Sequence, residues 1–109
     1  MFQKIKTKLV ILVSDTGTGT NLAAIIEGVN ERKINGEIVG LICDSINAPA
    51  LIHARKNNLR VEICQNKNEL LPLLSNFSPD YIALAGWKQF ISDEVILAYT
   101  NRILNLHPG

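Results

Sequence analysis

The chain has 109 residues, of which 47% are hydrophobic, and carries 11 Lys and Arg against 10 Asp and Glu. This composition is typical of one soluble α/β domain and excludes an intrinsically disordered chain. The net charge of +1 comes without any run of Lys or Arg, which argues against nucleic acid as a partner. Apolar runs such as Leu9–Val13 are far shorter than the roughly 20 residues that span a bilayer. We therefore expect no membrane segment and a cytoplasmic protein.

Apolar, β-branched segments alternate with segments of helical periodicity along the whole chain. The run Lys8–Ser14 ends in turn residues and is typical of a strand buried on both faces. Pro49 and Pro72 are each acceptable only near the start of a helix. In chain order we expect a strand over Lys8–Ser14, a helix from Thr20 or Asn21 with its exit near Gly36, a strand over Glu37–Cys43, a helix over Ala48–Asn57, a strand over Leu59–Cys64, a helix over Asn68–Phe77, a strand over Tyr81–Ala85, a helix over Asp93–Tyr99 and a strand over Arg102–Leu106.

This alternation predicts βαβ units with right-handed crossovers, and therefore an α/β fold built on a Rossmann-like, doubly wound parallel sheet. No repeat or Pro/Gly/Ser-rich linker interrupts the chain, so we place no boundary within residues 1–109. Ligands of such sheets bind outside the carboxyl ends of the strands. The residues that follow each strand are therefore the candidates for function.

A Gly-rich loop, Ser14–Asn21, follows the first strand and leads into a helix. Such a loop exposes backbone N–H groups, and the helix dipole favours an anion at the same point, so a phosphate site is expected there. The alternative is a plain tight turn. The dinucleotide fingerprint is absent because Leu22 stands where its last glycine would be, and the Gly-Lys-Ser/Thr of a P-loop is missing as well. Asp44, after the second strand, suits a ribose hydroxyl or a turn cap.

Asn105 and His107 lie two residues apart at the end of the last strand, so their side chains point to one side of an extended backbone. Pro108 favours that extended backbone. An amide that stabilises an oxyanion and an imidazole that exchanges a proton suit carbonyl chemistry, although a turn before proline explains the same residues. His53 has no companion ligand and is expected to be a partly exposed helix residue.

Cysteine usage points away from disulfides and metals. Cys43 and Cys64 are too few for a disulfide framework and have no partners at metal-ligand spacing. We expect two buried core thiols and no metal.

Three segments in register resemble the successive motifs of the folate-dependent glycinamide ribonucleotide formyltransferase family. The resemblance covers nearly the whole chain and about the first half of the family's catalytic domain. The three segments are Gly17–Leu22 (Gly-Thr-Gly-Thr-Asn-Leu), Ala85–Ser92 (Ala-Gly-Trp-Lys-Gln-Phe-Ile-Ser) and Arg102–Pro108 (Arg-Ile-Leu-Asn-Leu-His-Pro).

The resemblance implies transfer of a formyl group from 10-formyltetrahydrofolate to the amine of 5-phosphoribosylglycinamide, in purine biosynthesis and without a metal. It implies that Asn105 and His107 are the catalytic pair. It further implies a substrate phosphate site at Gly19, Thr20 and Asn21. The folate-binding residues it implies are Lys88, Gln89, Phe90, Ile91 and Asn105.

The chain also departs from the family pattern. Lys88-Gln89-Phe90 replaces a more usual Met-Arg-Ile, and the stretch 65–68 has no clear counterpart of a basic folate contact. The family's catalytic Asp, which orients the His, lies downstream of Gly109. We therefore expect the 109-residue chain alone to have little or no activity.

Two other classes of function stay open beside this enzyme. One is a non-catalytic module that binds a ribonucleotide phosphate. The other is a different formyl-handling enzyme, either a formyltetrahydrofolate deformylase or a methionyl-tRNA formyltransferase. The lack of a basic surface argues against the tRNA enzyme, and the absence of a regulatory domain before the first strand argues against the deformylase. The oligomeric state is not predicted.

Overall fold

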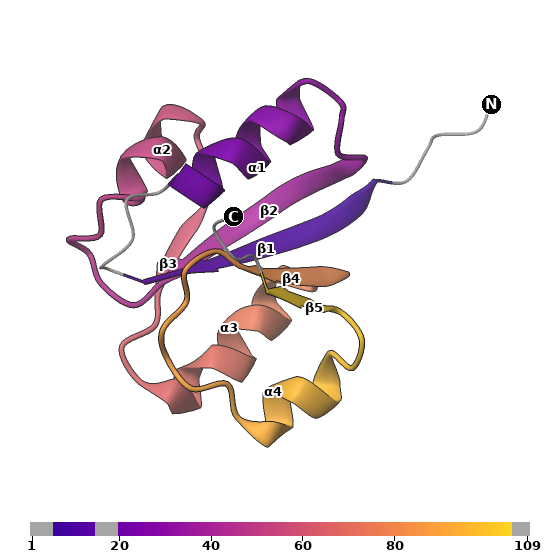
Figure 1. Cartoon of the computed structure of the whole chain (residues 1–109). Helices are drawn as coiled ribbons and strands as arrows, with labels where there is room; N and C mark the ends of the chain where they lie inside the picture. The colour runs from indigo at the N-terminus through magenta and orange to yellow at the C-terminus, as the bar shows by residue number, and fades with distance from the viewer. Residues whose placement is uncertain (1–5, 15–19, 106–109) are drawn as a thin grey trace.

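The computed structural model describes residues 6–14 and 20–105, in which strands and helices alternate as the sequence predicts (Figure 1). A short 3₁₀ turn, Lys67–Glu69, leads into the third helix. The elements are β1 (Thr7–Val13), α1 (Thr20–Asn30), β2 (Gly36–Cys43), α2 (Leu51–Lys56), β3 (Val61–Ile63), α3 (Leu70–Phe77), β4 (Tyr81–Leu84), α4 (Asp93–Ala98) and β5 (Ile103–Asn105).

The described strands form one sheet in the order β3-β2-β1-β4-β5, and every neighbouring pair is parallel. Helices α1 and α2 cover one face, and α3 and α4 cover the other (Figure 1). Each crossover therefore returns the chain to the same end of the sheet, as parallel pairing requires. The expected doubly wound α/β fold is confirmed.

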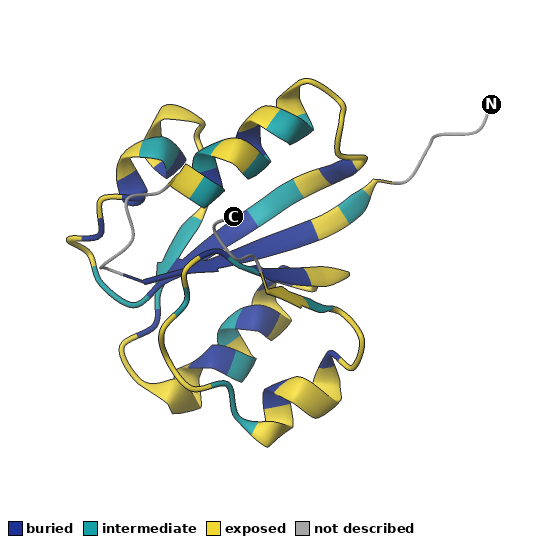
Figure 2. Ribbon diagram, in the orientation of Figure 1, coloured by how far each residue is buried: buried dark blue, intermediate teal, exposed yellow. Residues whose placement is uncertain are grey.

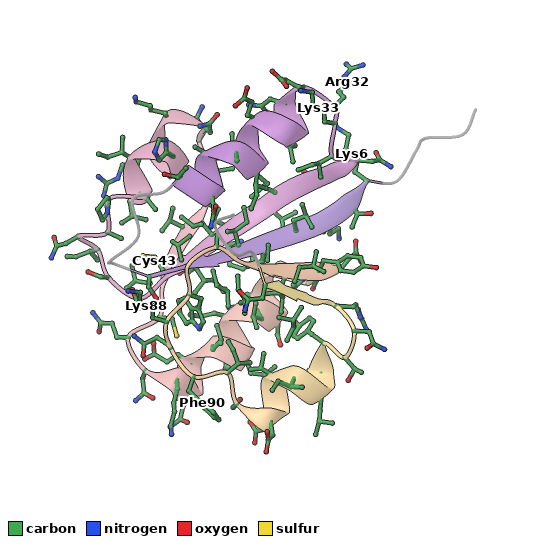
Figure 3. The ribbon with its side chains drawn as sticks, in the orientation of Figure 1. Lys6, Arg32, Lys33, Cys43, Lys88 and Phe90 are labelled. Atoms are coloured by element: carbon green, nitrogen blue, oxygen red, sulfur yellow. The ribbon has the colours of Figure 1, made fainter. Side chains whose placement is uncertain are left out.

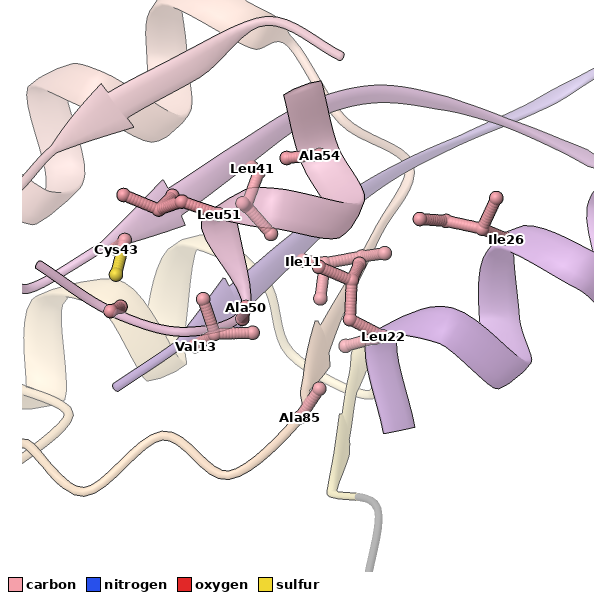
Figure 4. Packing of buried hydrophobic residues seen from close by; sticks show 12 residues of the cluster. Ile11, Val13, Leu22, Ile26, Leu41, Cys43, Ala50, Leu51, Ala54 and Ala85 are labelled. Atoms are coloured by element: carbon pink, nitrogen blue, oxygen red, sulfur yellow. The ribbon is translucent and has the colours of Figure 1, made fainter. Parts of the chain in front are cut away.

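Buried residues are concentrated in the central strands, as Figure 2 shows, and they form one cluster on each face of the sheet. Ile11 and Val13 of β1 belong to the cluster that packs under α1 and α2, which Figure 4 shows from close by. Val10 and Leu12 belong to the second cluster, under α3 and α4. Successive side chains of β1 therefore point alternately into the two cores. Because both faces of the strand are buried, its sequence is a continuous apolar run.

The exit of α1 differs from the prediction. The helix ends at Asn30, because Arg32 adopts a left-handed backbone with φ of 61°. The N–H groups of Lys33 and Ile34 then donate to the carbonyl oxygen of Gly28 at 2.8 and 3.0 Å and close the helix. Placing the helix exit near Gly36 was wrong, since Gly36 is the first residue of β2.

The second helix is shorter than predicted. It begins at Leu51, because residues 48–50 form tight turns in which the N–H of Leu51 donates to the oxygen of Ala48. Pro49 therefore precedes the helix instead of lying in its first turn. Pro72 does lie in the first turn of α3, where its missing N–H costs no helix bond.

The two cysteines confirm the sequence interpretation. Neither forms a disulfide, and Cys43 is fully buried under α1 and α2 whereas Cys64 is 4% exposed on the opposite face of the sheet. His53 is partly exposed in α2, as expected. Within residues 6–14 and 20–105, no group of His, Cys, Asp and Glu is placed to hold a metal ion. No helix in these ranges is long and apolar enough to cross a membrane.

A glycine allows β2 to pack closely against α3. The pairing of β1 with β2 shifts register between Leu9 and Val10, so that Leu9 pairs with Ile38 and Val10 with Gly40. A Cβ atom on Gly40 would overlap the ring of Phe77, which is buried in the core under α3. Only a residue without a side chain fits there.

We predict that Gly40→Ala lowers the free energy of unfolding by about 1–3 kcal/mol, because the added methyl overpacks the contact with Phe77. Denaturant unfolding of the protein measures this change. Gly28→Ala in α1 is the matched control, because its methyl meets Cδ1 and Cγ1 of the exposed Ile34 side chain, which has room to turn away. We expect the control to be neutral or to stabilise the helix by roughly 0.5–1 kcal/mol. Equal stability of both variants would contradict this account of the packing.

Candidate functional site

The strand order reverses beside β1, and this reversal locates the candidate site. From β1 the chain passes to β2 over the face covered by α1, whereas it reaches β4 from α3 on the other face. At the carboxyl edge of the sheet the chain therefore leaves β1 for α1 on one face and β4 for α4 on the other, and this edge is where doubly wound proteins bind ligands. Leu12, Leu84 and Asn105 are in register across β1, β4 and β5, so all three strands reach this edge together.

Thr20 is the first residue of α1, as the sequence predicts, and its side chain is exposed. Asn21 follows it and is half-buried. The first turn of this 11-residue helix presents backbone N–H groups at the carboxyl edge, next to the end of β1. Gly19, the third residue predicted to bind phosphate, lies outside the described residues.

Two hydrogen bonds, each donated by a backbone N–H, hold the segment after β4 against the end of β1. The N–H of Ala85 donates to the carbonyl oxygen of Leu12 at 2.9 Å. Gly86 then turns the chain with a φ of 81°, a conformation that favours glycine. The N–H of Lys88 donates to Oγ of Ser14 at 2.8 Å, and Ser14 is buried with 1% exposure. These bonds hold residues 85–88 over the point where the strand order reverses.

A further contact joins this segment to the end of β2. Nε2 of Gln89 donates to Oδ2 of Asp44 at 2.9 Å. Asp44 thus helps to hold the segment after β4 in place at this edge. Figure 3 labels Lys88 and Cys43, the last residue of β2, at the same end of the sheet, with Phe90 farther along the chain.

Four of the five residues predicted to bind folate lie in the segment after β4, and they differ in exposure. Lys88, Gln89 and Phe90 are exposed, and the Phe90 side chain reaches 71%. Ile91 is half-buried against the core under α3 and α4. The segment therefore offers a cation, an amide and an apolar ring toward solvent, while its end is anchored in the core.

Asn105 is the last residue of β5 and is exposed at the carboxyl edge. Its register with Leu84 sets it beside the start of the segment after β4. The structure thus brings Asn105, the segment 88–91 and the start of α1 to one edge of the sheet. His107 lies outside the described residues, so its predicted pairing with Asn105 stays a prediction.

A cavity of about 150 Å³ lies beside this segment, between the ends of β2 and β3 and the start of α3. Cys64 lines it and donates its thiol proton to the carbonyl oxygen of Asn66 at 3.2 Å. Burial, with a smaller contribution from the negative charge of Glu69, raises the pKa of the Cys64 thiol. The thiol is therefore protonated near neutral pH, and the protonated form is a poor nucleophile.

Sequence reasoning missed Ser14 and the contact between Gln89 and Asp44 as anchors of the segment after β4. One signal was present for Ser14. A polar residue that directly ends a strand buried on both faces is itself buried, and a buried hydroxyl requires a hydrogen-bond partner. The contact between Gln89 and Asp44 joins residues 45 positions apart and leaves no such signal.

Fold and site together define a Rossmann-like α/β protein whose candidate ligands bind at the carboxyl edge of a parallel sheet. The family model described as "Formyl transferase" matches residues 7–109. The chain belongs to this family. It resembles the family's glycinamide ribonucleotide formyltransferases, as its three motifs predict.

Two curated relatives and one solved structure show how far the similarity extends. The chain is 30% identical over 114 residues to the chloroplastic phosphoribosylglycinamide formyltransferase of Arabidopsis thaliana, covering 95% of this chain and 38% of that protein. It is 28% identical over 110 residues to phosphoribosylglycinamide formyltransferase of Escherichia coli (strain K12), covering 93% and 51%. Glycinamide ribonucleotide transformylase 1 of Geobacillus kaustophilus superposes with a TM-score of 0.85 at 27% identity, covering 95% of this chain and 59% of that chain. The chain thus spans less than two thirds of the length of each.

A formyltetrahydrofolate deformylase of Pseudomonas syringae also shares the fold. It superposes with a TM-score of 0.79 at 14% identity. At that identity the likeness shows the fold alone and does not distinguish the two activities.

We predict that Ser14→Ala accelerates hydrogen exchange at the amide of Lys88 by about fivefold, because this N–H loses its acceptor, a hydrogen bond being worth roughly 1 kcal/mol. Exchange followed residue by residue by nuclear magnetic resonance measures this. The amide of Ala85 is an internal control, because it donates to a backbone oxygen that the substitution leaves in place. Unchanged exchange at Lys88 would show that Ser14 does not hold the segment.

Proposed function

We propose that this chain forms the phosphate- and folate-binding portion of a phosphoribosylglycinamide formyltransferase. The reaction is transfer of a formyl group from 10-formyltetrahydrofolate to the amine of 5-phosphoribosylglycinamide, in purine biosynthesis. The observation that carries the proposal is the convergence of three family-like motifs on one edge of the sheet: the start of α1, the segment 88–91 and Asn105. The family match over residues 7–109 supports it.

The phosphate of 5-phosphoribosylglycinamide binds at Gly19, Thr20 and Asn21 in this proposal. Backbone N–H groups of the first turn of α1 donate to its oxygens, and the helix dipole adds a favourable potential. The Thr20 hydroxyl stands where the resembling family more often has a serine, so the hydroxyl donor is kept.

The folate co-substrate lies along Lys88, Gln89, Phe90 and Ile91. The exposed ring of Phe90 supplies apolar surface for a planar ligand, and the anchored backbone on either side gives that surface a fixed position. Asn105 faces the same ligand from the end of β5. No metal takes part in this assignment.

In the proposed reaction the neutral amine of the substrate attacks the formyl carbon, and a tetrahedral intermediate with a negative oxygen forms. The Asn105 amide and protonated His107 stabilise that oxygen. The proton released by the amine passes to the folate nitrogen as the C–N bond to the formyl group breaks, so that formylated product and tetrahydrofolate leave.

We propose further that residues 1–109 belong to one domain that is longer in the catalytically complete protein. The relatives extend well beyond the matched region, since this chain covers 51% of the Escherichia coli protein. A carboxylate from that further region orients His107 and favours its protonated form. The same region covers the folate site and strengthens electrostatic contacts by excluding water.

Titration with 5-phosphoribosylglycinamide tests the phosphate site. We expect amide resonances from Gly19 to Leu22 to shift in the folded protein at millimolar ligand. Gly19→Val is expected to weaken binding about tenfold or more, because a branched side chain blocks close approach of the anion to the backbone. Thr18→Ala is the control and should bind almost as well as the unchanged protein. If no amide in this stretch moves, the loop is a structural turn.

Activity measurements test the catalytic pair. In a catalytic domain completed to the length of the relatives, His107→Ala and Asn105→Ala should each lower turnover by roughly 10²-fold, as loss of a proton-transfer group or an oxyanion donor does. The 109-residue chain alone should be inactive or nearly so, because His107 then lacks its carboxylate partner. A spectroscopic assay of tetrahydrofolate release measures both. Full turnover by the 109-residue chain would disprove the assignment of a catalytic carboxylate outside it.

A further inference from the structure

The amino end of the sheet carries a hollow lined by cations. It has a volume of about 360 Å³ and lies where α1 ends and β1 begins. Lys6 and Arg32 line it, and no Asp or Glu is among its described lining residues. Neither cation has an ion pair within the described part of the chain, whereas Nζ of Lys33 pairs with Oε2 of Glu31 at 3.1 Å. Figure 3 shows the three cations together at this end.

Arg32 adopts a backbone conformation in which glycine or asparagine is usual. It follows α1 with a φ of 61°, where a side chain crowds the neighbouring backbone. Native proteins accept such a cost where the side chain has a role. Attraction to the negative end of the α1 dipole is one such role. It does not account for Lys6, which precedes β1 and lines the same hollow. Two cations from separate elements point to a bound anion.

Backbone groups around the hollow are not available to bind that anion. The N–H groups of four residues donate to carbonyl oxygens of α1 and its exit loop at 2.8–3.1 Å: Arg32, Lys33, Ile34 and Gly36. Phosphate sites commonly use free N–H groups at the start of a helix. Here the end of α1 borders the hollow, and its negative partial charge opposes a dianion more than a monoanion. A carboxylate, which matches the planar guanidinium of Arg32, therefore fits better than a phosphate.

A second hollow restricts the ligand to one negative charge. It has a volume of about 320 Å³ and adjoins the first, since both are lined by Lys6, Val29 and Gly36. Glu37 lines this second hollow and repels a further carboxylate. The first hollow also has an apolar wall, formed by the half-buried Val29 and by Ile34, which is 38% exposed. The ligand is therefore expected to carry one carboxylate on an apolar body.

We propose that this hollow binds a small branched aliphatic carboxylate, with its charge between Lys6 and Arg32 and its body against Val29 and Ile34. Two sources share this chemistry. One is a free aliphatic acid, and the other is the carboxyl terminus of a peptide that ends in an aliphatic residue. The hollow lies at the end of the sheet opposite the candidate active site. The proposal therefore does not depend on the proposed transferase function.

Nuclear magnetic resonance titration with sodium 4-methylpentanoate tests this site. We expect the amides of Ile34 and Gly36 to shift and saturate at millimolar probe, while those of Thr20 and Asn21 stay in place. Acetate, which lacks the aliphatic body, and 4-methylpentanamide, which lacks the charge, should each bind about fivefold more weakly. No shift at Ile34 and Gly36, or equal binding of the neutral amide, would overturn the proposal.

Substitutions of the cations separate binding from a purely structural role. Lys6→Gln and Arg32→Gly should each weaken 4-methylpentanoate binding about fivefold. Lys33→Gln is the matched control and should bind normally, because Lys33 pairs with Glu31 and does not line the hollow. Arg32→Gly should unfold at the same or a higher denaturant concentration, because glycine adopts the left-handed backbone freely. A less stable Arg32→Gly variant that binds normally would show that Arg32 acts on the helix end alone, and would overturn the proposal.

N-acetyl-L-leucine then identifies the source. Its acyl amide resembles a peptide bond, and Asn30 and Asn57 of the second hollow offer side-chain amides to bind it. Binding about fivefold tighter than 4-methylpentanoate points to the carboxyl terminus of a peptide, and equal or weaker binding points to a free acid. Both results support the hollow as an aliphatic carboxylate site, provided that Lys6→Gln weakens the binding of each probe. Binding that is insensitive to Lys6→Gln would contradict it.

Discussion

Strand β1 hydrogen-bonds to β2 along one edge and to β4 along the other, and its residues from Leu9 to Val13 are buried on both faces. This double burial requires helices on both sides of the sheet, and the chain supplies them because the strand order reverses beside β1. The reversal in turn sends the chain to α1 on one face after β1 and to α4 on the other face after β4. The candidate site is a consequence of where the central strand lies.

Much of this arrangement is predictable from the sequence, because the signals are local. The run Leu9–Val13 marks a strand buried on both faces, and helical spacing marks α1. The exit of α1 was misplaced because it depends on the left-handed backbone of Arg32, a residue without a turn preference of its own. The hydrogen bond between Lys88 and Ser14 joins residues 74 positions apart. It forms only when the sheet folds, so no local sequence signal predicts it.

The candidate site relies on backbone groups more than on charged side chains. Three of the described cations, Lys6, Arg32 and Lys33, gather at the opposite end of the sheet, as Figure 3 shows. At the carboxyl edge, the first turn of α1 offers N–H groups, while Ser14 and Asp44 hold the segment after β4 in place. A binding surface made of anchored backbone loses little entropy when a ligand binds. Because parallel strands end at the same edge, motif residues that are far apart in the sequence can meet there.

The central claim is that the start of α1 and the segment 88–91 bind the two substrates of one transfer reaction, side by side. A crystal structure of the protein with 5-phosphoribosylglycinamide and a stable analogue of 10-formyltetrahydrofolate tests this most directly. The account predicts the phosphate against the N–H groups of residues 19–21 and the folate along Lys88–Ile91, with the substrate amine directed toward Asn105. A phosphate bound at Lys6, Arg32 and Lys33, or a folate bound away from the carboxyl edge, would contradict it.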